Sequence, residues 1–155
     1  AGYNPHEYRW GDGLATILDY HLAAEGVEYP AVVASGQPLR LGVSFRFQAD
    51  IFRPILGVTI KTKEGITVYG ANSETLEVEA LRTVCRAGQA MIGEIAFACR
   101  LAPGDYFISL GIAGRQGETI VPHDRRYDAI HLHVGPERRF FGLADLDMEM
   151  RATPA

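Results

Sequence analysis

Residues 38–50 read PLRLGVSFRFQAD, and apolar and polar side chains alternate along this stretch one by one. Leucine, valine and phenylalanine take every second position, with arginine, glycine, serine and glutamine between them. Because successive side chains of a strand point to opposite faces of a sheet, the pattern predicts a β-strand with one buried face. The other face is polar, and it carries Arg40 and Arg46.

The same period of two recurs along most of the chain. The runs that show it cover residues 89–101, 104–114, 121–134 and 138–150. Residues 55–73 read as a hairpin whose turn ends at Gly65, a residue that is free to adopt a positive φ. About eight or nine short strands separated by Gly, Pro, Asn and Asp, with no long helix between them, predict an all-β fold, an antiparallel β-sandwich.

Two segments do not follow this period. Residues 12–26 carry leucine and isoleucine at helical spacing, with Asp12 as an N-cap and Gly26 just past the C-terminus. That periodicity predicts a helix. Residues 73–84 fit either a short helix or an edge strand.

Composition narrows the class of protein. A chain of 155 residues, 47% of them hydrophobic, is enough for one globular domain and little for two. The formal charge is −4 and the cationic residues are scattered, which argues against binding to nucleic acid. No apolar run approaches the roughly 20 residues that a membrane-spanning helix needs, so we expect a soluble domain.

The cysteines and the N-terminus carry weaker signals. Cys85 and Cys99 lack the spacing of a metal site or a disulfide framework, so we expect two buried free thiols. The start at Ala1 and Gly2 is typical of a cut tag or an excised domain. We therefore assign residues 1–8 to a tag remnant or linker and residues 9–155 to the domain.

Several motifs, in this order along the chain, resemble one family. They are YRWGDGLATILDYHL at residues 8–22, SGQPLRLGVSF at 35–45, the hairpin from Gly57 to Asn72, and the corner from Leu101 to Tyr106. From about Arg9 to Met150 the chain resembles the C-terminal domain of Wzt, the nucleotide-binding subunit of ABC transporters that export O-antigen polysaccharides in Gram-negative bacteria. No Gly-x-x-x-x-Gly-Lys-Ser/Thr loop is present, so the ATPase itself is absent from this chain.

The resemblance implies a fold, a ligand and partners. It implies a jelly-roll or immunoglobulin-like sandwich that binds the terminally modified, non-reducing end of the exported glycan and has no cofactor. It also implies a homodimer in which the C-terminal strand is exchanged, and it makes residues 9–22 a strand. The further partners would be the ATPase domain of the same subunit and the membrane permease, so the domain would be cytoplasmic, at the inner membrane.

A glycan site needs planar hydrogen-bonding side chains and an aromatic platform. The polar face of the strand at 38–50 supplies the first kind. If the strands at 89–101 and 104–114 are its neighbours, Glu94, Arg100 and Ser109 extend this face. The predicted glycan-binding residues are Arg40, Ser44, Arg46, Gln48, Glu94, Ser109, His131, His133 and Trp10. Because arginine forks pair with carboxylates and phosphates, the excess of arginine on this face predicts an anionic group at the end of the glycan.

Other functions fit the residues less well. His131, His133 and Glu137 match the centre of a cupin metal motif, but no second histidine motif follows them. A metal-dependent jelly-roll enzyme is the alternative that they suggest. Ser109, His131 and Asp128 are the residue types of a Ser-His-Asp catalytic triad, but the sequence lacks a nucleophile-elbow motif. The third alternative is a purely structural dimerisation domain.

Overall fold

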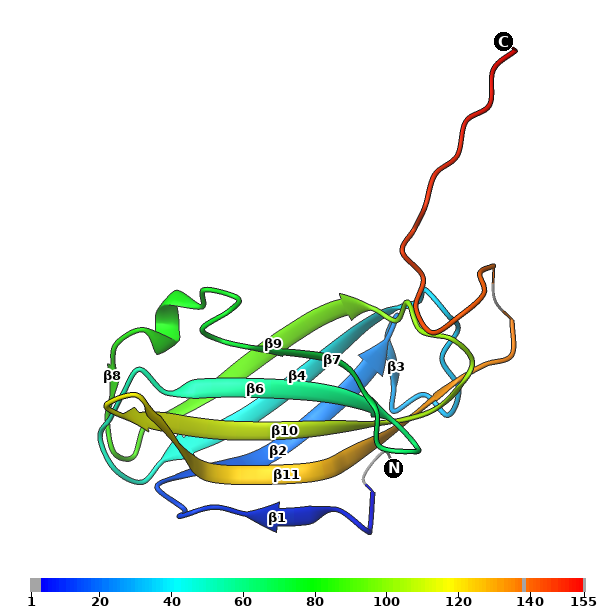
Figure 1. Ribbon diagram of the computed structural model, residues 1–155. Coiled ribbons are helices and arrows are strands. Elements are labelled where there is room, and N and C mark those ends of the chain that lie inside the picture. The colour runs from blue at the N-terminus through cyan, green and yellow to red at the C-terminus, as the bar shows by residue number, and fades with distance from the viewer. Residues whose placement is uncertain (1–3, 138, 155) are drawn as a thin grey trace.

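The computed structural model describes residues 4–137 and 139–154, and it is built almost entirely of β-strands (Figure 1). The strands are β1 (Tyr8–Trp10), β2 (Ala15–Ala24), β3 (Val27–Glu28), β4 (Pro38–Phe47), β5 (Ile51–Phe52), β6 (Ile55–Thr62), β7 (Thr67–Asn72), β8 (Val84–Cys85), β9 (Ala90–Ala98), β10 (Gly104–Gln116) and β11 (Thr119–Val134). One 3₁₀ turn, η1 (Glu79–Leu81), precedes β8. None of the described residues forms a helix that is long and apolar enough to cross a membrane.

Two antiparallel sheets face each other across the core, as the sequence predicts. The first sheet has the order β1-β11-β10-β6-β7 and the second has the order β3-β2-β4-β9, while β5 and β8 form a separate pair. Phe45 and Phe47 from the second sheet are buried with Ile108 and Ile130 from the first. Each large apolar side chain buried in this way contributes about 1.5–3 kcal/mol.

Strand β4 confirms the alternation read from residues 38–50. Leu39, Leu41, Val43, Phe45 and Phe47 are each at most 1% exposed. The residues between them face outward, and β4 lies in the interior of its sheet between β2 and β9. The hairpin of β6 and β7 is likewise confirmed.

Strand β2 shows that the helix predicted over residues 12–26 is wrong. The register with β4 shifts between Ile17 and Asp19, so the strand contains a bulge. The buried positions on either side of the bulge are Ile17 and Tyr20, which are three residues apart. A bulged strand thus reproduces one step of the helical spacing. The strand that the resemblance implies here is confirmed.

The C-terminal region also differs from its prediction. Among the described residues after Val134, none belongs to a strand, and one bridge joins Ala144 to Leu101. Residues 139–150 therefore do not form the strand expected at 138–150, and the chain runs away from the sandwich after the bridge at Ala144 (Figure 1).

At the other terminus, Ala1 and Gly2 lie outside the described residues. Asn4 donates its side-chain amide to the carbonyl of Asp128 at 2.8 Å, so residues near the N-terminus contact the sandwich. Cys85 and Cys99 are buried and free, as expected. Burial raises the pKa of Cys99 to about 11, which keeps the thiol protonated.

Candidate functional site

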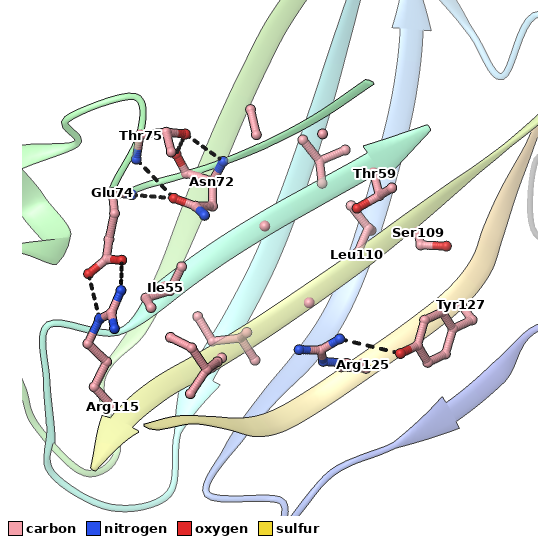
Figure 2. A pocket seen from close by; sticks show the side chains of 18 residues that line it. Ile55, Thr59, Asn72, Glu74, Thr75, Ser109, Leu110, Arg115, Arg125 and Tyr127 are labelled. Carbon is pink, nitrogen blue, oxygen red and sulfur yellow. Dashed lines mark hydrogen bonds and ion pairs between the residues drawn. The ribbon is translucent and has the colours of Figure 1, made fainter. Parts of the chain in front are cut away.

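The outer face of the five-stranded sheet carries a hollow, which we call the trough (Figure 2). One row of cross-strand partners crosses the sheet from β1 to β7 and consists of Trp10, Arg125, Gly111, Gly57 and Asn72. The two middle positions are glycines and have no side chain, whereas the positions on either side of them do. The volume of the trough is about 500 Å³. Its lining includes Ile55, Gly57, Thr59, Gly70, Asn72, Glu74, Thr75, Ser109, Leu110, Gly111, Arg115, Arg125 and Tyr127.

Glycine keeps the floor of the trough open. A Cβ atom added to Gly57 or Gly111 would meet no atom closer than 3.8 Å. Neither residue has a positive φ, so the backbone does not require glycine at these positions. Glycine inside a strand weakens it because no side chain packs there. The feature that these glycines do provide is the hollow itself.

An aromatic wall, formed by Tyr8, Trp10, Arg125 and Tyr127, borders the trough on the side of β1 and β11. The guanidinium of Arg125 lies 5.6 Å from the ring centroid of Trp10. The rings of Tyr8 and Tyr127 stack with centroids 6.2 Å apart. Arg125 also donates to the Tyr127 hydroxyl at 3.4 Å, which lowers the pKa of that phenol. The wall therefore combines flat apolar faces with hydrogen-bonding groups.

Partly buried ion pairs hold β1 in place behind this wall. The guanidinium of Arg9 donates to both carboxylate oxygens of Asp124, at 2.9 and 2.7 Å, and this bond raises the pKa of Arg9. The backbone N–H of Ile17 donates to the same carboxylate at 2.8 Å. Arg126 pairs with Glu7 through two hydrogen bonds. Three residues of strand alone would fix β1 weakly, so these contacts determine where the wall stands.

The opposite wall consists of the turn that follows β7. The Asn72 side-chain oxygen accepts the backbone N–H groups of Glu74 and Thr75, each at 2.9 Å, and so orders the turn. Arg115 donates to both carboxylate oxygens of Glu74, at 3.1 and 2.6 Å. This hydrogen bonding lowers the pKa of Glu74. The ion pair spans from β10 to the turn at one end of the trough (Figure 2).

Strand β11 contains a bulge opposite Ser109. Asp128 lies in the bulge with a φ of 55°, an uncommon value for a non-glycine residue. Its N–H donates to the Ser109 hydroxyl at 2.9 Å. Its Oδ1 atom is buried 2.9 Å from the Lys61 ammonium, although the angles are poor for a hydrogen bond. The bulge brings Tyr127 into the trough, while Ala129 and Ile130 return to the core.

The predicted glycan-binding residues lie on opposite faces of the sandwich. Those on or next to the outer face of the four-stranded sheet are Arg40, Ser44, Arg46, Gln48 and Glu94. Glu94 joins the arginines as expected because β9 pairs with β4. Ser109 does not, because β10 lies between β6 and β11 in the other sheet. The expected extension of this face by residues 104–114 is therefore wrong.

Ser109 and Trp10 belong to the trough side. Ser109 lines the trough, and Trp10 is 41% exposed at its border instead of filling a corner of the core. Arg100, a further candidate for the arginine-bearing face, lies after β9 and pairs with Asp147 at 3.4 Å. The nine predicted residues thus do not form one site.

His131 and His133 project from β11 on the same outer face as the trough. The Asp105 carboxylate accepts a hydrogen bond from each imidazole at 2.8 Å, and these bonds lower the pKa of Asp105. The His131 ring also stacks on Phe107 with centroids 5.3 Å apart. Within residues 4–137 and 139–154, no group of three or more His, Cys, Asp or Glu side chains is arranged to hold a metal ion. The metal-enzyme alternative is not supported.

The catalytic triad of Ser109, His131 and Asp128 does not form either. His131 bonds to Asp105, and Ser109 accepts the backbone N–H of Asp128. Arg125, Tyr127, Asn72 and the Glu74–Arg115 pair were not predicted as site residues, since only the strand order brings them together from β7, β10, β11 and the turn after β7. The signal that could have revealed the trough is the pair of glycines at the same level of adjacent strands.

Comparison with known proteins identifies the family. A family model described as the Wzt C-terminal domain matches residues 6–146. The chain belongs to this family. Members of the Wzt C-terminal domain family are carbohydrate-binding domains of O-antigen ABC transporters, so this chain is a binding domain of that kind. No sequence among curated proteins gives a significant match.

A solved structure agrees with this assignment. The crystal structure of the C-terminal domain of Wzt is similar with a TM-score of 0.89 and 33% identity, over 98% of this chain and 92% of that chain. A β-glucosidase from Erythrobacter marinus is similar only at a TM-score of 0.40 and 14% identity, over 76% of this chain and 15% of its own. A cellulose-active polysaccharide monooxygenase from M. thermophila reaches 0.39 and 14%, over 74% and 59%.

Proposed function

We propose that the trough binds the non-reducing end of an O-antigen polysaccharide and that the domain does so without catalysing a reaction. The observation that carries this proposal is the glycine floor between two walls of hydrogen-bonding and aromatic side chains. A sugar ring is flat and covered with hydroxyl groups. It therefore fits an open floor, a stacking face and planar polar groups better than it fits a convex surface.

The ends of the trough favour a chain terminus over an internal segment. The ion pair of Glu74 and Arg115 stands across one end, and the Lys61–Asp128 pair stands beyond Ser109 on the same face. A polysaccharide passing through would have to cross these pairs. A terminal unit only has to enter between them.

The test compares two glycine-to-valine variants by titration calorimetry with the O-polysaccharide of the same bacterium. Gly111→Val fills the floor, and we expect it to lower affinity by at least about tenfold, as expected when a packed ligand contact is lost. Gly42→Val is the matched control, since Gly42 is also an outward strand residue with open space around it, on the other sheet. Equal effects of the two variants, or none, would place the glycan elsewhere. Fragments lacking the native non-reducing terminus should bind far more weakly than intact chains.

We also propose that the domain forms a homodimer by exchange of its C-terminal segment. Leu146, Met148 and Met150 are 79%, 79% and 88% exposed, and alternate residues of an extended chain share one face. A groove of about 400 Å³ lies between the sheets at the free edge of β9 and is lined by apolar residues. These include Leu56, Val58, Leu76, Val78, Met91 and Ile95. An unpaired edge of this kind accepts an added strand.

Analytical ultracentrifugation tests the dimer. We expect a mass near twice the 17.0 kDa of the chain. Replacing Leu146 and Met148 by aspartate should yield a folded monomer, because the apolar face of the exchanged segment is lost. A folded wild-type monomer at high concentration contradicts the proposal.

The family places this domain in an ABC transporter. On that basis we propose that its further partners are the ATPase domain of the same subunit and the membrane permease. The domain would then work on the cytoplasmic side of the inner membrane, held there by the transporter.

A further inference from the structure

The charged side chains that line or border the trough are paired, with one exception. Arg115 pairs with Glu74, and Lys61 pairs with Asp128. Arg125 forms no ion pair within residues 4–137 and 139–154, and the one hydrogen bond of its guanidinium goes to the neutral Tyr127 hydroxyl. The trough therefore carries one uncompensated positive charge in a chain whose formal charge is −4.

Arg125 is also placed to reach a ligand. Its cross-strand neighbour is Gly111, and a Cβ atom added to Gly111 would lie 3.8 Å from the Arg125 Cγ atom. The stem of the arginine therefore runs beside the open floor. The ring of Trp10 supports one face of its guanidinium and leaves most of the N–H edge available.

We propose that Arg125 anchors an anionic group, a carboxylate or a phosphate, on the terminal part of the glycan bound in the trough. This inference rests on the proposed function of the trough. The Arg125 guanidinium is partly covered and has no anionic partner among the described residues, which is energetically unfavourable. An anionic ligand would supply that partner, so the site should bind an acidic ligand more tightly than a neutral one of the same shape. The sequence predicts the anionic group on the face that carries Arg40 and Arg46, whereas the anchor proposed here lies on the opposite face of the sandwich.

Trp10 provides a direct readout because it is the only tryptophan of the chain. Its ring stacks on Arg125, so occupation of the site should change its fluorescence. The experiment titrates the dimeric or monomeric wild-type domain, as isolated, with O-polysaccharide from its own bacterium at low and high salt. It repeats the titration after chemical reduction of carboxylates and, separately, after removal of phosphate.

We expect affinity to fall about 10- to 100-fold when the responsible acidic group is removed, as for loss of a charge-assisted pair. The treatment that has this effect identifies the group as carboxylate or phosphate. Arg125→Gln should cause a similar loss and abolish the salt dependence. Arg125→Lys should recover only part of the affinity, because an ammonium cannot form the two-bond fork. Arg86→Gln, an exposed arginine paired with Asp50, controls for the change in net charge.

Other outcomes separate the two proposals. If Gly111→Val abolishes binding but Arg125→Gln and both chemical treatments do not weaken it, the trough binds a neutral glycan and the anion inference is wrong. If Arg46→Gln removes the salt dependence and Arg125→Gln does not, the anion site lies on the four-stranded sheet. If neither Gly111→Val nor Arg125→Gln affects binding, the trough itself is not the site. Thermal unfolding of each variant confirms that the fold is intact.

Discussion

The two outer faces of the sandwich both carry arginine, but they present it differently. On the four-stranded sheet, Arg40 and Arg46 project from the same outer face of β4, and neither has a carboxylate partner among the described residues. On the five-stranded sheet, Arg125 lies against Trp10 beside a floor of glycine. The difference teaches that alternation along one strand predicts a polar face, whereas a recess on that face depends on the side chains of neighbouring strands.

The largest effect should come from the buried carboxylate behind the aromatic wall. Asp124→Ala leaves Arg9 and the Ile17 N–H without their acceptor, so we expect a loss of about 2–3 kcal/mol in the free energy of unfolding. Glu94→Ala, the exposed carboxylate of the other face, should change it by less than about 0.5 kcal/mol. Urea denaturation measures both. Equal losses would show that β1 is not held by its ion pairs.

Trp10 and Ile92 are large exposed side chains, one on each outer face of the sandwich, so replacing them tests which face binds the glycan. Trp10→Ala should weaken glycan binding by about 1–2 kcal/mol, because it removes the stacking surface and the support of Arg125. Ile92→Ala, on the four-stranded sheet, should leave binding unchanged although Ile92 is 73% exposed. Calorimetry with the native polysaccharide provides the measurement. A larger loss with Ile92→Ala would reverse the assignment of the faces.

Arg46 tests the sequence-based site directly. With the glycan in the trough, Arg46→Ala should leave the affinity unchanged, since Arg46 projects from the opposite sheet. A loss of about 1–3 kcal/mol would return the binding site to the four-stranded sheet, where the sequence predicted it. The Arg40→Ala variant should behave in the same way as Arg46→Ala.

The smallest change in stability for which we expect a measurable pH dependence concerns Asp105, between the two histidines. Hydrogen bonds from His133 and His131 lower its pKa in the folded state. The bonds therefore stabilise the fold at pH values above the unfolded pKa of about 3.9, and the contribution is lost as the pH falls through the folded pKa. Because the site is partly exposed, Asp105→Asn should cost less than about 1 kcal/mol near pH 7. The difference from wild type in urea denaturation should disappear in strong acid.

Regular alternation was predictable from sequence, and the positions of the bulges were not. β4 keeps a strict period of two because one of its faces is buried. In β2 the bulge after Ile17 puts the next buried residue, Tyr20, three positions away, and the pattern then imitates a helix. In β11 the bulge places Ala129 and Ile130 together in the core, so the outward position of Tyr127 could not be read from alternation.

The trough was missed because its main feature is the absence of side chains. Gly57 and Gly111 read as turn formers or weak strand positions in a linear sequence. The two glycines form a hollow only because they are cross-strand partners. This pairing depends on the strand order, which the alternation of side chains does not determine. Trp10 and Ser109 were predicted as glycan-binding residues from their type alone, and their place beside the trough depends on neighbours from distant parts of the chain.

The pairing of β1 with β11 has a consequence for synthesis of the protein. Arg9 and Asp124 are 115 positions apart, so the aromatic wall joins the first strand of the sandwich along the chain to the last. Contacts between such distant segments form slowly, and an emerging chain cannot make them until β11 has left the exit tunnel. The nascent domain can pair β2 with β4 early, but it acquires its aromatic wall only after β11 has been synthesised.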